Sequence, residues 1–425
     1  MVAFLTAAPS SGAGKTVVTV GLVAALRRRG HAVQPAKVGP DYIDTAFLTA
    51  AAGRPAVNLD LWAMRPALVD YLAAPRDLVV EGVMGLFDGP QAGEGSSADV
   101  AKRLRLPVVL VVNAERMSHS VAALVHGFAS FDPQVTLAGV ILNRAGSVRH
   151  EAMLRDALAA VAVPLLGVIP RDEALALPSR HLGLKQAREH GDLGGRIGDI
   201  ADTVARHVDL PALENLGGDR SPVGAAPPDP LPPLGSHIAI ARDDAFAFVY
   251  EHILDGWRRG GATLSTFSPL AGEAPSPAAD AVYLPGGYPE LHGKTLASKR
   301  EWVDGLRRLA AAGAPIYGEC GGYMALGEQL VDAGGVSHPM AGLLPITTSF
   351  ATPRRVLGYR RFTHDGSAAP LPRTLRGHEF HYASVAAEPG SIFSVFSATG
   401  DCLPPCGHRS GSVWGSFQHM ICFEA

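Results

Sequence analysis

Two short stretches of the chain combine residue types that could carry out chemistry. In the first, an apolar run passes through small residues from Pro9 onward into Gly14-Lys15-Thr16. Backbone N–H groups of such a loop can surround phosphate oxygens, the lysine adds a positive charge, and the threonine hydroxyl can reach Mg²⁺. The strict phosphate-loop pattern has glycine where Pro9 stands, so the match is incomplete. The preceding strand pattern and the following helix pattern nevertheless favour a nucleotide site.

The second stretch runs from Gly318 to Gly322 and has the form Gly-x-Cys-x-Gly between a strand pattern and a helix pattern. It is the cysteine counterpart of a nucleophile elbow, in which small residues allow a strained turn. The N-terminus of the following helix is expected to lower the pKa of Cys320. Backbone N–H groups at Gly286 and Gly287, after a neighbouring strand, could form an oxyanion hole. The alternative is a buried structural cysteine.

A thiolate nucleophile needs a general base, and His419 is the leading candidate among sixteen histidines. His378 and His381 are competitors that could instead be structural or bind a metal. Two histidines without further ligands are poor evidence for zinc. Cys402 and Cys406 lie in a Pro-rich stretch without a second ligand pair, so they too are poor evidence for a metal.

The elements that position these residues follow an alternating pattern. A helix is predicted over residues 15–29. Five apolar runs read as strands: residues 32–38, 78–82, 106–113, 137–143 and 166–170. Continuous apolar strands separated by helices predict a parallel sheet covered on both faces. Ligands of such sheets bind at the carboxyl ends of the strands, where Glu81, Asn113 and Asn143 emerge.

A Pro- and Gly-rich stretch without apolar periodicity, residues 211–236, reads as a linker. The α/β pattern starts again at His237. We therefore predict an α/β fold with two domains. Residues 1–210 form a phosphate-loop domain with a mostly parallel, doubly wound sheet, and residues 237–425 form a second α/β domain.

Composition excludes several function classes. The 425 residues are 47% hydrophobic and 18% charged, which fits globular domains with substantial cores. A formal net charge of −3 without a basic stripe predicts neither nucleic acid nor a membrane surface as a partner. Four cysteines are too few for a disulfide framework. With no charged leader and no apolar span of bilayer length, we expect a cytoplasmic protein.

Taken in order, the motifs resemble those of the cobyrinate/hydrogenobyrinate a,c-diamide synthases of cobalamin biosynthesis, over nearly the whole chain. The first half is similar to a P-loop domain of the dethiobiotin-synthetase type, and the second to a class I glutamine amidotransferase of the cobyrinate type. The matching segments are Ser10–Thr16, Lys37–Asp44, Glu81–Gly89, Leu284–Glu290, Tyr317–Met324, Gly358–Arg360, Gly377–Tyr382 and Gly415–His419.

The resemblance implies an ATP- and glutamine-dependent ligase that amidates the a and c side-chain carboxylates of a corrin ring. Phosphorylation by ATP with Mg²⁺ would turn a poor carboxylate leaving group into an acyl phosphate, and ammonia from glutamine would displace the phosphate. The implied partners are a corrin acid, ATP and L-glutamine, and a homodimer is left open. The segment Asn58–Trp62 favours metal-free hydrogenobyrinate over cobyrinate, by resemblance.

The resemblance also implies a role for each matching residue. Phosphates would be held by Gly12, Ala13, Gly14 and Lys15. The Mg²⁺ contacts would be Thr16, Asp41 and Glu81. The substrate carboxylate and the acyl phosphate would lie near Asp41, Tyr42, Asp44 and Asp88. Adenine would be read by Asn113 and Asn143. In the second half Cys320 would be the nucleophile, His419 the base, and the N–H groups of Gly287 and Gly321 the oxyanion donors. Loop capping is the alternative role for Asp44 and Asp88.

One position departs from the usual glutaminase triad. That triad has a carboxylate two residues after the histidine, where this chain has Ile421. The residue that orients His419 is therefore unassigned, and Glu424 is only the nearest acid. Two other functions remain open. One is a switch ATPase with a degenerate amidotransferase-like domain, although the signature lysine of such ATPases would fall at Ser10. The other is a cysteine amidohydrolase that needs no ATP.

Overall fold

The computed structural model describes residues 1–75, 77–175, 179–180, 183–184, 187, 191–217, 227–386 and 390–424. It divides the chain into one unit of Met1–Trp62 and Pro66–Pro228, and a second of Ala63–Arg65 and Asp229–Ala425. Residues 218–226 of the predicted linker lie outside the described residues. Helix α8 (Leu210–Glu214) begins just before the predicted linker and belongs to the first unit.

The first unit is built on a seven-stranded, all-parallel sheet of order β3-β2-β4-β1-β5-β6-β7. Its strands are β1 (Ala3–Ala7), β2 (Gln34–Val38), β3 (Val57–Leu59), β4 (Leu78–Glu81), β5 (Val108–Asn113), β6 (Leu137–Ala145) and β7 (Leu165–Pro170). Nearly all of their residues are buried, because helices cover both faces of the sheet. This confirms the predicted parallel α/β fold.

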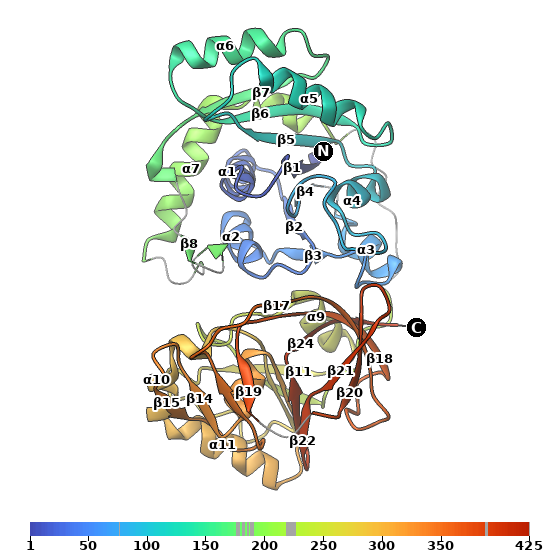
Figure 1. Ribbon diagram of the computed structural model, residues 1–425, viewed down its shortest axis with the longest axis vertical. Helices are drawn as coiled ribbons and strands as arrows, with labels where there is room; N and C mark the ends of the chain where they lie inside the picture. The colour runs from blue at the N-terminus through green and yellow to red at the C-terminus, as the bar shows by residue number, and fades with distance from the viewer. Residues whose placement is uncertain are drawn as a thin grey trace. The chain divides into compact units, whose positions relative to one another are not determined.

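Helices connect the strands in doubly wound fashion. They are α1 (Lys15–Arg28), α2 (Ile43–Ala52), α3 (Pro66–Leu72), α4 (Ser97–Leu104), α5 (Ser120–Ser130), α6 (Val148–Leu158) and α7 (Leu193–His207), with a short η1 (Glu173–Leu175) and a β8–β9 ribbon (Ser179–Arg180, Gly183–Leu184). The apolar faces of α1, α2 and α7 share one core with the sheet, whereas α3 and α4 lie on its other side (Figure 1).

The second unit contains a six-stranded sheet of order β11-β10-β12-β13-β23-β22, parallel except for β22. Its strands are β10 (His237–Ala241), β11 (Thr263–Phe267), β12 (Ala281–Leu284), β13 (Ile316–Glu319), β22 (His408–Ser410) and β23 (Val413–Ser416). The helices are α9 (Glu251–Arg259), η3 (Pro289–Leu291), α10 (Gly293–Ser298), α11 (Arg300–Ala311) and α12 (Gly321–Leu326). This confirms the second α/β domain.

Two further sheets complete the second unit. A four-stranded sheet contains β14 (Gln329–Val331), β15 (Ser337–Pro339), β16 (Thr347–Ser349) and β19 (Ser384–Ala386). A five-stranded antiparallel sheet contains β17 (Val356–Thr363), β18 (Thr374–His381), β20 (Phe393–Ser397), β21 (Cys402–Cys406) and β24 (Gln418–Phe423). β24 follows β23 after a single residue, so the chain passes from one sheet to the other just before His419.

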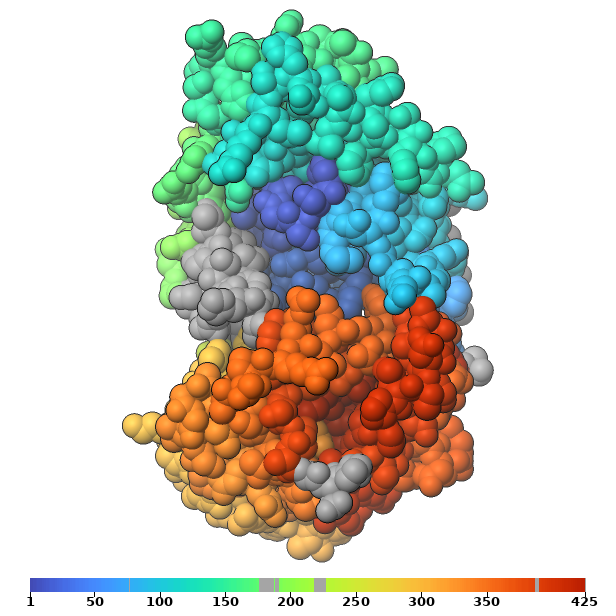
Figure 2. Space-filling model, in the orientation of Figure 1, coloured from blue at the N-terminus to red at the C-terminus, as the bar shows by residue number. Residues whose placement is uncertain are grey.

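Strand register places the polar strand ends side by side. In the first unit Lys37 and Thr6 are both Cα partners of Glu81, and Asn113 is the partner of Asn143. Side chains at paired positions of parallel strands point to the same face. The register therefore brings predicted site residues together at the carboxyl edge of the sheet. Figure 2 shows one face of the molecule with the side chains drawn, and most of these groups are buried.

A pair of helical glycines tests the packing of the first unit. A Cβ added at Gly21 in α1 would lie 2.5 Å from Val204 Cγ2 and 2.9 Å from Ile200 Cγ2, both in α7. We expect Gly21→Ala to lower the free energy of unfolding by about 1–3 kcal/mol through overpacking. A Cβ added at Gly127 in α5 has no atom within 4 Å, so Gly127→Ala should raise the free energy of unfolding by about 0.5–1 kcal/mol. Urea denaturation followed by circular dichroism measures both, and equal effects would contradict the close α1–α7 packing.

Candidate active sites

The loop between β1 and α1 contains two glycines in the left-handed backbone region. Gly12 has φ 82° and Gly14 has φ 88°, which other residues rarely adopt. Helix α1 begins at Lys15, directly after the second glycine, so its first N–H groups have no partner within the helix. Helix N-termini of this kind bind phosphate. This geometry supports the prediction that residues 12–16 bind the phosphates of a nucleotide.

Behind this loop, four polar side chains form what we call the strand-end cluster: Thr16, Lys37, Asp44 and Glu81. Thr16 Oγ1 donates to Glu81 Oε1 at 2.7 Å. Lys37 Nζ donates to Glu81 Oε1 at 3.0 Å and to Asp44 Oδ2 at 2.6 Å. The cluster therefore joins the phosphate loop, β2, α2 and β4 through charged hydrogen bonds.

Burial governs the electrostatics of the cluster. Glu81 is fully buried and Lys37 is 3% exposed. Burial raises the pKa of Glu81 to about 7, although Lys37 and Thr16 act in the opposite direction. Burial also opposes the charge of Lys37, but Asp44 and Glu81 outweigh it and hold the pKa of this lysine above its usual value. The lysine is therefore a fixed positive charge at the sheet edge.

The lysine of the phosphate loop lies in front of the same cluster. Lys15 Nζ donates to the carbonyl oxygen of Met84 at 2.5 Å. Burial and the neighbouring charge of Lys37 lower the pKa of Lys15 to about 8. A partly desolvated lysine beside a second cation is an environment that favours a bound anion. This supports the predicted phosphate contact of Lys15.

Lys37 was not among the predicted site residues. The resemblance placed it only at the start of a matching segment. A lysine within an otherwise apolar strand pattern is the signal that could have identified it, because buried lysines occur almost only where they are paired. What the sequence could not supply is the register between β2 and β4 that sets Lys37 beside Glu81.

The residues predicted near the substrate carboxylate have local structural contacts as well. Asp41 Oδ1 accepts hydrogen bonds from two N–H groups in the first turn of α2, at 2.8 and 2.9 Å. Burial and the charge of Asp44 raise the pKa of Asp41 to about 6. Asp88 Oδ2 accepts from the N–H of Gly85 at 2.8 Å. Tyr42 is half-buried at the start of α2. Of the four, Asp44 alone enters the strand-end cluster.

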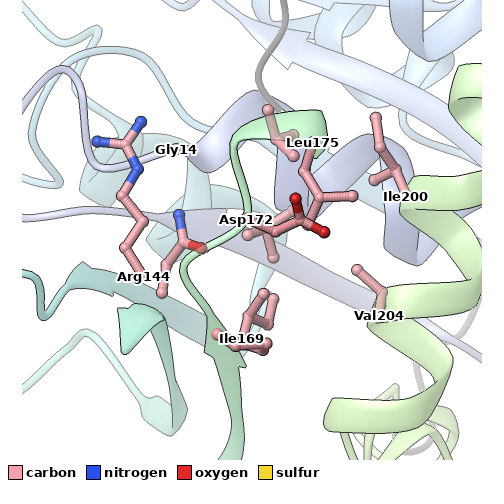
Figure 3. Close-up of a pocket in the computed structure, with 11 residues that line it drawn as sticks. Gly14, Arg144, Ile169, Asp172, Leu175, Ile200 and Val204 are labelled. Carbon is pink, nitrogen blue, oxygen red and sulfur yellow. The ribbon is translucent and has the colours of Figure 1, made fainter. Parts of the chain in front are cut away.

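A pocket beside the phosphate loop is the candidate site for the base (Figure 3). Its walls include the apolar side chains Ile169, Leu175, Ile200 and Val204, and its polar groups include Asn143, Arg144 and Asp172. Asn143 Nδ2 donates to the carbonyl oxygen of Ala13 at 3.0 Å, so this side chain also supports the loop. Asn113, on the neighbouring strand, accepts from the N–H of Glu115 at 3.0 Å and is not among the described residues that line the pocket.

In the second unit, Cys320 occupies a strained turn between β13 and α12. Its φ is 46° and its ψ is −102°, outside the regions that most residues adopt. Glycines make this turn possible, since a Cβ at Gly322 would lie 1.9 Å from the carbonyl oxygen of Leu284. The side chain is 4% exposed. The local geometry is that of a nucleophile elbow, as the sequence predicts.

The predicted depression of the Cys320 pKa is wrong for this structure. Burial raises the pKa of the thiol well above its usual value, and the nearby charge of Glu290 adds to the effect. The hydrogen bond from the N–H of Gly321 acts in the opposite direction and is outweighed. The thiol therefore keeps its proton at neutral pH, and a base must take it during the reaction.

His419 lies where that base is needed. A Cβ added at Gly286 would lie 2.4 Å from His419 Cε1 and 3.4 Å from Cys320 Cβ. The side chains of His419 and Cys320 therefore both lie next to Gly286, and the absence of a side chain there leaves space for them to come into contact. Burial and the neighbouring rings of His378 and His381 lower the pKa of His419 well below its usual value. A neutral imidazole is the form that can accept a proton.

The predicted oxyanion donors are neighbours in the structure. A Cβ at Gly321 would lie 2.8 Å from the backbone nitrogen of Gly287, and a Cβ at Gly287 would lie 2.0 Å from the carbonyl oxygen of Ala245. Only glycine fits at either position, and the backbone of Gly287 passes close to Gly321, the residue after Cys320. Paired N–H groups are what a developing oxyanion requires.

The competing histidines have partners of other kinds. The ring of His378 stacks on that of His419 with centroids 4.7 Å apart, and burial lowers the pKa of His378 to about 3. The Nε2 atom of His381 lies 3.1 Å from Glu379 Oε1, and its ring stacks on that of Phe417. Both histidines line the catalytic region but lie on β18, whereas His419 lies on β24.

The nearest acid in the sequence does not approach His419 through any described contact. Glu424 Oε2 accepts from Arg361 Nε at 2.8 Å, and its Oε1 accepts from Arg376 Nε at 2.6 Å. Ile421, two residues after the histidine, is buried, and its carbonyl oxygen lies 2.8 Å from His252 Nε2. Neither position supplies the third member of a triad.

The fold and the two sites define a class of protein. A phosphate-loop domain with a parallel sheet and a cysteine–histidine elbow domain together make a two-domain, nucleotide-dependent glutamine amidotransferase. The sequence matches the family described as the CobQ/CobB/MinD/ParA nucleotide binding domain over residues 4–184. It matches the CobB/CobQ-like glutamine amidotransferase domain over residues 237–425.

Relatives that align over the whole chain identify the family more narrowly than these two domain matches. The chain is 54% identical to a hydrogenobyrinate a,c-diamide synthase of Brucella anthropi, covering 100% of this chain and 99% of the relative. Proteins of the same name from Sinorhizobium sp. and Rhodobacter capsulatus are 52% and 49% identical, covering 99% and 98% of this chain and 99% and 97% of the relatives. A solved glutamine amidotransferase covers 44% of this chain and 90% of its own at 16% identity, with a TM-score of 0.29.

The chain belongs to the hydrogenobyrinate a,c-diamide synthase family. It is a glutamine-dependent carbon–nitrogen ligase that uses ATP. Among the residues that the structure describes, none of the helices has the length and apolar character needed to cross a bilayer.

Asn143 offers a test of the base pocket. We expect Asn143→Ala to weaken ATP binding about tenfold, because the buried carbonyl of Ala13 loses its donor and the pocket loses a polar edge. Inorganic tripolyphosphate, which occupies only the loop, should lose less affinity. Isothermal titration of both ligands makes the comparison, with Asn113→Ala as the matched control outside the pocket. Equal losses for ATP and tripolyphosphate would contradict an adenine contact of Asn143.

Proposed function

We propose that this enzyme amidates the a and c side-chain carboxylates of hydrogenobyrinate, using ATP to activate each carboxylate and glutamine to supply the nitrogen. The observation that carries the proposal is the presence in one chain of two chemically complementary sites, the phosphate loop with its strand-end cluster and the Cys320–His419 pair. The relatives with this name align over nearly their full length, which supports the same substrate.

The first site performs the activation. Gly12, Ala13, Gly14 and Lys15 hold the nucleotide phosphates, and the pocket that Asn143 lines receives the adenine. The γ-phosphoryl group passes to a substrate carboxylate and gives an acyl phosphate and ADP. Such a transfer depends mainly on positioning and on neutralising charge. The fixed charge of Lys37 lies next to the loop and is well placed to neutralise the reacting oxygens.

The strand-end cluster also fits a magnesium ion. Glu81 Oε2 is buried and has no hydrogen-bond partner among the described residues. The hydroxyl of Thr16 donates a hydrogen bond to Oε1, the other oxygen of the same carboxylate. Mg²⁺ is typically bound by one or two carboxylates together with substrate phosphates and water. Thr16 and Glu81 would hold it, with Asp41 as the third predicted contact, and it would neutralise charge on the β- and γ-phosphates.

The substrate is proposed to approach the same edge. The loops that follow β2 and β4 contain Asp41, Tyr42 and Asp88. Asp44, a member of the cluster, lies in the first turn of α2. Asn58 Nδ2 donates to the carbonyl oxygens of Gly39 and Asp41 at 2.8 and 2.9 Å, which fixes the first of these loops. These contacts support a loop shaped to receive the corrin side chain.

The second site releases ammonia. The Cys320 thiol transfers its proton to His419 as its sulfur attacks the side-chain amide carbon of glutamine. The oxyanion that forms is stabilised by the N–H groups of Gly287 and Gly321. Collapse of the intermediate returns the proton to the leaving nitrogen, which departs as ammonia, and water then hydrolyses the thioester to glutamate. Ammonia attacks the acyl phosphate, and phosphate leaves as the amide forms.

Three finer points remain predictions within this proposal. They are the use of Mg²⁺, a homodimeric state and a cytoplasmic location. The alternative functions are less favourable, because a switch ATPase would leave the Cys320 elbow without a role and an ATP-independent hydrolase would leave the phosphate loop without one.

Cys320→Ala separates the two half-reactions. We expect glutamine-dependent amidation to fall at least about 10³-fold, because the nucleophile is lost, while ammonium-dependent amidation is retained. Product formation with glutamine or ammonium chloride as donor, followed by mass spectrometry, measures both. Cys402→Ala, which removes an exposed cysteine, is the control and should keep both activities. Equal loss of both activities in Cys320→Ala would contradict two separate sites.

Substrate choice tests the identity of the corrin. We expect kcat/KM for hydrogenobyrinate to exceed that for cobyrinate at least roughly tenfold, since cobalt adds charge and axial ligands that a site shaped for the metal-free ring must accommodate. Both substrates are compared under identical ATP, glutamine and magnesium concentrations. Equal or faster turnover of cobyrinate would overturn the substrate assignment and leave the two-site chemistry intact.

A further inference from the structure

Neither Ile421 nor Glu424 supplies the third member of the glutaminase triad, so it must come from another element packed around His419. One carboxylate lies close. Glu319 is the residue directly before the nucleophile, at the end of β13, and its Oε2 atom is 4.0 Å from His419 Nδ1. Both side chains are buried, at 0% exposure for Glu319 and 2% for His419. We propose that Glu319 orients His419 and stabilises its protonated form during glutamine hydrolysis.

The carboxylate of Glu319 is held in one position by donors from three strands. The phenol of Tyr283 in β12 donates to Oε2 at 2.7 Å, and that of Tyr317 in β13 donates to Oε1 at 3.0 Å. The backbone N–H of Met420 in β24 donates to Oε1 at 3.1 Å. A carboxylate with three donors is fixed in rotation, and the last donor ties it to the residue next to His419.

The two ring nitrogens of His419 have different roles in this proposal. Nδ1 is the ring nitrogen that lies nearest Glu319 Oε2, so we assign the uptake of the thiol proton to Nε2. At 4.0 Å the pair is longer than a hydrogen bond in the resting protein. Catalytic hydrogen bonds often tighten only when substrate is bound. As Nε2 takes the thiol proton, the ring becomes a cation, and a buried anion next to Nδ1 then stabilises it.

Other ionisable groups around the pair cannot replace Glu319. His378 from β18 stacks on His419, and His381 lies nearby, but both disfavour a cationic ring. Glu379 forms ion pairs with Arg360 and His381. Glu319 is therefore a positioning residue that acts through His419 and does not itself touch the substrate. The inference rests on the proposed glutaminase function of Cys320 and His419.

The test is Glu319→Gln, which keeps the size of the side chain and removes its charge. We expect the glutaminase kcat to fall roughly 10²-fold with little change in KM for glutamine. Ammonium-dependent amidation should stay within about twofold, which shows that both domains are folded. Glu319→Asp should recover at least about a tenth of the wild-type kcat, because a carboxylate is restored. Glu424→Gln is the matched control, an acid near His419 in sequence that pairs with arginines, and should behave as wild type.

The pH profile distinguishes an electrostatic role from a structural one. Burial raises the pKa of Glu319 to about 7, against the donors Tyr283, Met420 and Tyr317. The wild-type glutaminase kcat should therefore rise with pH up to about 7 as this carboxylate ionises, whereas Glu319→Gln should be nearly flat from pH 6 to 8. His419 does not contribute this limb, because its own pKa lies well below its usual value.

Three outcomes would overturn the inference. They are a Glu319→Gln enzyme with a glutaminase rate within threefold of wild type, an equal loss of the ammonium-dependent reaction, and an Asp variant no better than Gln. Cys320→Ala, measured alongside, distinguishes a failure of the proposed function from a failure of the role of Glu319. If it keeps glutamine-dependent activity, the proposed function fails, and if it loses that activity while Glu319→Gln does not, only the role of Glu319 fails.

Discussion

The burial of a carboxylate at the carboxyl end of a central parallel strand is the constraint on which both sites depend. Glu81 ends β4 and Glu319 ends β13, and both are fully buried. Burial raises the pKa of each to about 7. A buried carboxylate is costly unless donors surround it, so each site is organised around the groups that satisfy it. Such strongly shifted groups are typical of functional sites.

The two carboxylates are satisfied in different ways, and the difference matches the chemistry. One oxygen of Glu81 accepts hydrogen bonds from a lysine and a threonine, and the other has no hydrogen-bond partner within the part of the chain that the structure describes. This arrangement suits a site that receives a cation and phosphates. Glu319 has two phenols and one backbone N–H. None of these donors carries a charge, so the negative charge of Glu319 remains available to a neighbouring imidazolium.

The fold and the two turns that carry the candidate sites could be predicted from sequence because their signals are local. Apolar runs define the strands, and the glycines around Lys15 and Cys320 define the two turns. Lys37 and the acid near His419 could not be found in this way, since both depend on which strands lie side by side. The pKa of Cys320 was predicted in the wrong direction because burial, which outweighs the hydrogen bond from Gly321, is a property of the whole domain.

The position of Glu319 follows from the change of sheet at His419. In a strand, residues two apart point to the same face, so an acid at position 421 would approach His419 from a neighbouring position on the same strand, β24. Here Ile421 takes that place and is buried in the unit. β24 lies in the antiparallel sheet, but its Met420 N–H reaches across to the end of β13. The acid can therefore come from β13, the strand that ends one residue before Cys320. Moving the carboxylate from position 421 to position 319 need not remove the negative charge that a protonated His419 requires.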